Sequence, residues 1–93
     1  MVIGKVETLG LRQEVGRRLR EARLNVGLTQ VNMAADIGMP STYLSEVETG
    51  KRNITLRTLT GIASFLGLDV KVKFVPKPTG KRSARRQGTR PIT

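Results

Sequence analysis

The sequence contains no cysteine, no histidine and no tryptophan, and its aromatic residues are one tyrosine and two phenylalanines. The lack of cysteine excludes disulfides and thiol nucleophiles. Without cysteine and histidine the chain has no zinc site of the usual type and no imidazole general base. Few aromatics argue against RNA modules that stack bases on exposed rings. We therefore expect no catalytic residues, no metal site, no cofactor and no enzymatic activity.

Acidic residues are also scarce, with 7 Asp and Glu against 17 Lys and Arg. Residues 1–75 carry 11 basic and 7 acidic side chains, whereas residues 76–93 carry 6 basic and none acidic. An excess of positive charge indicates an anionic partner, and we expect double-stranded DNA. The alternative is that the charge only keeps the protein soluble.

Long apolar runs are missing as well. No stretch approaches the ~20 apolar residues of a membrane helix, and "MVIGKVETLG" lacks the apolar core of a signal peptide. We expect no membrane partner and a cytoplasmic location, associated with the nucleoid through DNA. A chain of 93 residues is expected to build one core.

Four stretches have the apolar spacing of a helix, and each is followed by a glycine suited to the left-handed conformation that ends helices. The stretches span residues 11–26, 29–37, 40–49 and 55–66, and the glycines are Gly27, Gly38, Gly50 and Gly67. Thr29 and Thr55 are suited to cap the second and fourth helices. We expect Met39 to cap the third helix, with Pro40 as its first helical residue.

The period changes after residue 68. Val70, Val72 and Phe74 alternate with lysines, which predicts a short β-strand over 69–75. A lone strand is unstable, so it needs either the N-terminal "MVIGKV" or the same strand of a second copy, and we favour the second. Residues 1–8 are predicted to form an N-terminal arm, and residues 76–93 a disordered basic tail.

The third helical stretch, "PSTYLSEVET", has two faces. Leu44 and Val47 share the apolar face, while a reading face of small polar side chains lies opposite: Ser41, Thr42, Ser45, Glu46 and Thr49. Short hydroxyl side chains suit contacts to base edges or phosphates in a major groove. The alternative is an ordinary amphipathic surface helix. Two short helices around a tight glycine turn form a helix-turn-helix, whose second helix reads the groove.

Residues 15–68 resemble the Cro/Xre-type helix-turn-helix family, to which the lambda repressor belongs, through "LREAR", "GLTQ", "IGM", "LSEVETGKRN" and "LTGIASFLGL". The resemblance implies an all-α, lambda-repressor-like bundle of four to five helices over 9–68, followed by the strand. It also implies a sequence-specific transcriptional regulator, a repressor that binds a palindromic operator as a homodimer with reading helices roughly 34 Å apart.

Two other functions remain open. The strand and tail resemble HipB-like antitoxins, so the alternative is an antitoxin that regulates its own operon and neutralises a toxin protein. A third hypothesis is a nonspecific nucleoid or RNA-associated protein.

The resemblance also assigns roles to single residues. The base-reading positions are Ser41, Thr42 and Glu46, and the phosphate-binding positions are Gln30, Thr49, Lys51, Arg52 and Asn53. Arg23 and Glu48 are paired as a structural salt bridge between the first and third helices. Two alternatives stay open: Gln30 as a plain helix-start residue, and Glu46 as the partner of a surface Lys or Arg.

Overall fold

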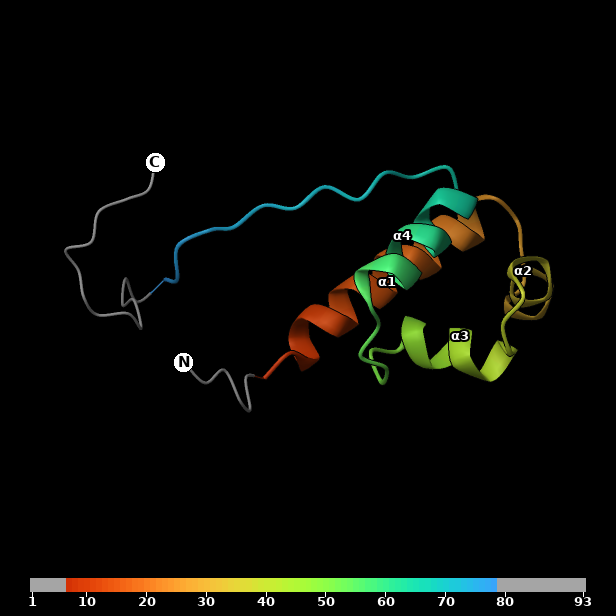
Figure 1. Cartoon of the computed structure of the whole chain (residues 1–93), viewed down its shortest axis with the longest axis horizontal. Helices are drawn as coiled ribbons and strands as arrows, with labels where there is room; N and C mark the ends of the chain where they lie inside the picture. Colours follow the sequence, from red (N-terminus) through yellow and green to blue (C-terminus); the bar gives the residue numbers. More distant parts are fainter. Residues whose placement is uncertain (1–6, 79–93) are drawn as a thin grey trace.

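A computed structural model of the chain describes residues 7–78 and contains four helices within this range (Figure 1). They are α1 (Leu9–Asn25), α2 (Gln30–Ile37), α3 (Ser41–Glu48) and α4 (Leu56–Phe65). The predicted all-α class is confirmed. Most of the predicted N-terminal arm and the tail beyond residue 78 lie outside the described residues. Within them, no helix combines the length and the apolar character needed to cross a membrane.

The predicted threonine caps are found at the starts of α2 and α4, and all four predicted glycines, Gly27, Gly38, Gly50 and Gly67, have a positive φ. The hydroxyl oxygen of Thr29 accepts a hydrogen bond from the Asn32 N–H at 3.0 Å, and that of Thr55 accepts one from the Thr58 N–H at 3.0 Å. Each satisfies a backbone N–H that a helix start leaves without an intrahelical partner. At the end of α2, Gly38 has φ +77°, a conformation that costs glycine little and other residues more.

The start of α3 differs from the prediction by one residue. Pro40 is the N-cap, with φ −64° and an extended ψ of 143°, and the helix begins at Ser41. The carbonyl of Pro40 accepts the Leu44 N–H at 3.2 Å, whereas the N–H of Met39 donates to the Ala34 carbonyl at 2.9 Å. Proline fixes φ but not ψ, and the extended ψ of Pro40 sets it outside the helix as the cap, in the position that we expected for Met39.

The core lies where the four helices meet. Met33, Leu44 and Ile62 are fully buried, and Leu19, Ala34, Val47 and Leu66 complete the cluster. The predicted apolar stripes extend beyond this core. Leu11 is 66% exposed and Leu56 is 75% exposed, because each lies in the first or second turn of its helix, outside the cluster. They flank a groove described below.

Helix α3 packs against α1 and α2. In Figure 1, α2 is seen almost end-on while α3 lies across the view, so the two helices of the helix-turn-helix cross at a steep angle. The connection between them is short, from Gly38 to Pro40. Because α3 is held from two sides, its remaining face is presented outward.

The predicted strand over 69–75 is not confirmed. The segment is extended: its first residues, 69–71, lie beside α1 and α4, and the rest runs away from the helices (Figure 1). No strand is formed anywhere in residues 7–78. Val72 is 70% exposed and Phe74 is 91% exposed. A β-strand needs a second extended segment with which to exchange backbone hydrogen bonds, and none lies beside residues 69–75 in the described part of the chain.

Candidate DNA-binding surface

The two faces of α3 separate as its sequence predicts. Leu44, Val47 and Glu48 are buried. On the reading face Thr42 and Thr49 are exposed, and Ser41, Ser45 and Glu46 are half-buried. Lys51, Arg52 and Asn53 follow in an exposed loop. The residues predicted to read bases and most of those predicted to bind phosphate therefore form one continuous surface.

A polar clamp, consisting of the buried Arg23 and Glu48 and the half-buried Gln30, fixes α3 to α1 and α2. Arg23 Nε donates to Glu48 Oε2 at 2.7 Å and its Nη2 donates to Oε1 at 3.0 Å. Gln30 Nε2 donates to the same Oε1 at 2.9 Å. The Arg23 and Glu48 side chains are 6% and 1% exposed. This is the pair that the resemblance implies, with Gln30 as an additional member.

The clamp satisfies its own charges. Arg23 also donates from Nη1 to the Leu28 carbonyl at 2.7 Å, between α1 and α2. The hydrogen bond to Glu48 raises the pKa of Arg23, while burial lowers it by less, so the guanidinium stays charged. A buried ion pair persists when its geometry is good and its other polar atoms are hydrogen-bonded. Both conditions hold for Arg23.

Helices α1 and α3 approach closely at Gly16, which is buried in the middle of α1. A Cβ at this position would collide with the Val47 carbonyl oxygen and would lie 2.5 Å from that of Glu48. The last turn of α3 therefore rests directly on the α1 backbone. This seam, Gly16 against Val47 and Glu48, sets the height of α3 above α1.

The loop after α3 is anchored to α1 as well. Gly50 has φ +82°, and a Cβ there would lie 2.6 Å from Gln13 Cγ and 2.9 Å from the Gln13 backbone. Its carbonyl accepts a hydrogen bond from Arg12 Nε at 2.9 Å. The path of residues 51–53 is thus fixed by α1. The sequence indicates only that Gly50 ends a helix.

A second Arg–Glu pair lies on the surface itself. Arg52 Nε donates to Glu46 Oε1 at 2.7 Å, and the guanidinium carbon of Arg52 lies 4.7 Å from the centre of the Tyr43 ring. Here the side chains are 50% exposed for Arg52 and 44% exposed for Glu46. The structure therefore joins a predicted phosphate-binding residue to a predicted base-reading residue. Such an internal partner was the open alternative for Glu46.

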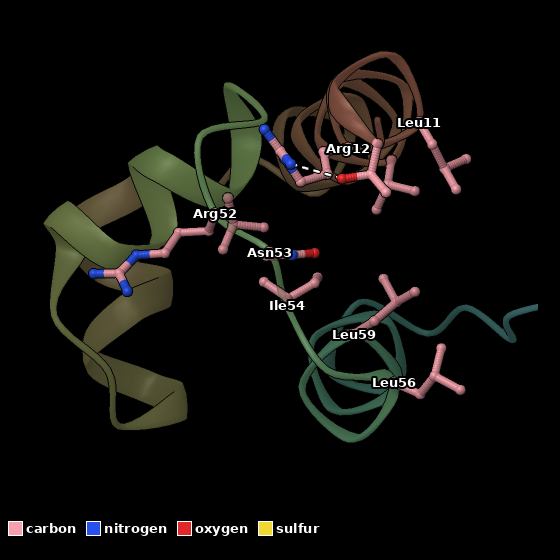
Figure 2. A pocket seen from close by; sticks show the side chains of 10 residues that line it. Leu11, Arg12, Arg52, Asn53, Ile54, Leu56 and Leu59 are labelled. Carbon is pink, nitrogen blue, oxygen red and sulfur yellow. Dashed lines mark hydrogen bonds between the residues drawn. The ribbon is translucent and has the colours of Figure 1, made fainter. Parts of the chain in front are cut away.

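A shallow groove of about 170 Å³ lies beside this surface, between α1, the loop and α4 (Figure 2). Its walls are mainly apolar, from residues such as Leu11, Val15, Ile54 and Leu56. Small-molecule sites span roughly 300 to 1,000 Å³, so the groove is small for one. Figure 2 shows the Arg52 guanidinium directed away from it, toward α3. No cluster of potential metal ligands occurs in residues 7–78.

Two structural residues were missed at the level of sequence. Gly16 carried a signal, because a glycine inside a helix is destabilising unless another backbone must come close. No sequence signal indicated the role of Arg12, since its contact with Gly50 depends on how α1 and the loop pack. Two other arginines of α1, Arg17 and Arg18, pair with Glu21 and Glu14 on the same helix.

Comparison with known proteins gives a consistent result. A family model described as helix-turn-helix matches residues 19–72. The chain is 35% identical over 60 residues to the ImmF control region 10 kDa protein of Bacillus phage phi105, covering 64% of this chain and 67% of that protein.

Two crystal structures of restriction-modification controller proteins are also similar. C.AhdI from Aeromonas hydrophila has a TM-score of 0.61 and 33% identity, over 64% of this chain and 91% of that one. C.Esp1396I, a tetramer in complex with its natural 35 base-pair operator, has a TM-score of 0.58 and 30% identity, over 63% and 78% of the two chains.

Proposed function

The chain belongs to the helix-turn-helix family of DNA-binding transcriptional regulators, and we propose that it represses transcription by occupying a palindromic operator as a homodimer. One observation carries the proposal: α3 is fixed from below by the polar clamp while its reading face stays open to a ligand. A helix held in this way can enter the major groove of DNA without rearranging.

Within that groove, Ser41, Thr42 and Glu46 contact base edges. Hydroxyl groups donate and accept, so Ser41 and Thr42 suit several bases, whereas a carboxylate accepts from the amino group of cytosine. Because α3 begins at Ser41, both hydroxyls lie in its first turn, the part of a reading helix that contacts bases.

Phosphate contacts are assigned to Gln30, Thr49, Lys51, Arg52 and Asn53. Gln30 uses one amide N–H for Glu48, and its second N–H, beside the start of α2, suits a phosphate oxygen. Lys51, Arg52 and Asn53 are exposed on the loop that α1 anchors. Such contacts fix the register of the protein on DNA.

The homodimer is assigned to antiparallel pairing of the extended residues 69–75 from two copies. The exposure of Val70, Val72 and Phe74 supports this proposal, because pairing across a two-fold axis would bond one backbone edge of each segment and bring these side chains into contact with those of the partner on one face. The basic residues 76–93 add nonspecific, salt-sensitive affinity. We also assign the protein to the cytoplasm, where its DNA lies.

The relatives support DNA as the partner more than a toxin. The similar proteins reported above are a phage control-region protein and two restriction-modification controllers, one crystallised on its operator. None of these three is an antitoxin. The antitoxin alternative therefore has no observation that favours it.

Selection from random double-stranded DNA tests the proposal. We expect the selected sequences to share a palindromic consensus. Ser41→Ala or Thr42→Ala should relax this consensus. Lys51→Ala should weaken binding to every DNA and make the salt slope shallower by about 0.9 per subunit. A selection without consensus would contradict sequence-specific binding. A preference altered by Lys51→Ala alone would overturn the assigned roles.

The dimer is tested by two matched substitutions. Phe74→Asp places a carboxylate on the apolar face of the extended segment, and Lys73→Asp places one on the opposite face. We expect the first to convert the dimer to a monomer in analytical ultracentrifugation and the second to leave it intact. Equal behaviour of the two variants would rule out pairing through this segment.

A further inference from the structure

Two side chains assigned to different DNA contacts bind each other in the protein without DNA. We infer that the Glu46–Arg52 pair is a switch that couples base reading to phosphate binding, closed on nonspecific DNA and opened by a base that donates a hydrogen bond to Glu46. This inference rests on the proposed function and deepens it. It makes Arg52 a residue that determines specificity, although the base contact belongs to Glu46.

The closed state is defined by two contacts. Arg52 Nε lies 2.7 Å from Glu46 Oε1, and its guanidinium lies 4.7 Å from the centre of the Tyr43 ring. The loop contributes the arginine, and α3 contributes both of its partners. These two contacts hold the guanidinium against α3, so it is not extended toward a phosphate.

In the closed state the pair has no net charge. A lysine or arginine binds nonspecific DNA by replacing the counterions of a phosphate, and this effect needs an uncompensated positive charge. With its charge balanced by Glu46, Arg52 contributes little to that attraction. The carboxylate also repels phosphates, so the closed pair lowers the affinity for nonspecific DNA.

Opening the pair is easy because both side chains are about half exposed. Water screens exposed pairs, and their stability is correspondingly small. An amino group of cytosine in the groove offers Glu46 a replacement donor. Once Glu46 turns to the base, Arg52 regains an uncompensated charge and binds a phosphate. The contact of Glu46 with the base and that of Arg52 with a phosphate therefore form together on the operator, whereas on other sequences the pair stays closed.

Arg52→Ala and Lys51→Ala provide a matched test, because the two residues are adjacent in the same loop. Each variant of the full chain is titrated onto the selected operator and onto a random duplex of equal length over a range of salt concentrations. Lys51→Ala weakens binding to both DNAs. Arg52→Ala weakens operator binding by about tenfold and leaves the salt slope on random DNA unchanged, because the closed pair neutralises no phosphate there. The uncompensated Glu46 lowers the affinity for random DNA, but by less than Lys51→Ala does.

Glu46→Gln tests the other half of the pair, since it keeps the shape and removes the charge. On random DNA we expect tighter binding and a salt slope steeper by about 0.9 per subunit, because Arg52 is now uncompensated. Adding Arg52→Ala to Glu46→Gln reverses this gain. On the operator Glu46→Gln weakens binding and alters the preference at one base pair.

The outcomes separate the switch from the function on which it rests. If selection gives a consensus but Arg52→Ala weakens both DNAs as Lys51→Ala does, the switch is wrong and the regulator stands. If Glu46→Gln leaves random-DNA binding unchanged, the carboxylate does not restrain Arg52 and the switch is also wrong. If selection gives no consensus, the proposed function itself fails.

Discussion

The two Arg–Glu pairs that involve α3 have the same chemistry and the same length but opposite surroundings. In both, an arginine Nε lies 2.7 Å from a glutamate oxygen. Arg23 and Glu48 are 6% and 1% exposed, whereas Arg52 and Glu46 are 50% and 44% exposed. The shortest distance would rate the pairs equal, but burial separates them, as does the second hydrogen bond that Arg23 donates from Nη2.

Burial changes what each pair can do. Breaking the buried pair leaves a charge without a partner in the core, at a cost of roughly 3–5 kcal/mol. An exposed pair contributes only about 0–1 kcal/mol, because water solvates both ions when it opens. The first pair is therefore suited to hold α3 in place, and the second to exchange partners at a DNA surface.

The largest expected effect comes from removing Glu48. Glu48→Ala leaves Arg23 charged and buried, and we expect the free energy of unfolding to fall by about 3–5 kcal/mol in urea denaturation. Replacing both residues by apolar ones, as in Arg23→Met with Glu48→Leu, should recover most of this loss, since no lone charge remains. A double variant as unstable as Glu48→Ala would show that the charge is not the cause.

A second comparison concerns the seam beneath Glu48. Gly16→Ala brings a methyl group against the Val47 and Glu48 carbonyls, and we expect it to destabilise the fold by about 1–3 kcal/mol. Gly61 is exposed in the middle of α4, and no atom lies within 4 Å of the position that an added Cβ would take. Gly61→Ala should therefore stabilise by roughly 0.5–1 kcal/mol. Thermal unfolding should show a lower melting temperature for Gly16→Ala and a higher one for Gly61→Ala.

Much of the fold could be predicted from local sequence. Thr29 and Thr55 cap helices because a hydroxyl can accept from a free N–H at a helix start, a requirement that involves only neighbouring residues. Leu44 and Val47 lie on the buried side of α3 because helical periodicity alone fixes which side chains share a face. The Arg23–Glu48 pair, 25 residues apart in sequence, was available only through the family resemblance.

Other features depend on how distant segments meet. The Glu46–Arg52 pair requires the path of the loop, which Gly50 and Arg12 determine through α1. The start of α3 was misplaced by one residue because proline fixes φ but not ψ, so the sequence does not show whether Pro40 is the cap or the first helical residue. Residues 69–75 have the alternation of a strand, but pairing requires a partner that the sequence pattern does not specify.

Gln30 offers a smaller test of the clamp. Gln30→Ala removes one of the hydrogen bonds to Glu48 but leaves both from Arg23, so we expect a loss of about 1 kcal/mol in unfolding free energy. Gln30→Glu keeps the size and places a second carboxylate beside Glu48. It should destabilise more than Gln30→Ala, because two like charges would lie side by side. Equal losses at neutral pH would place Gln30 outside the clamp.

The smallest expected effect on stability is at the exposed pair. Glu46→Ala should lower the free energy of unfolding by less than about 1 kcal/mol, and the loss should diminish further in 1 M salt, which screens exposed charges over about 3 Å. Urea unfolding at low and high salt measures both quantities. A loss as large as that of Glu48→Ala would mean that Glu46 and Arg52 support the fold, and a pair that supports the fold could not exchange partners on the operator.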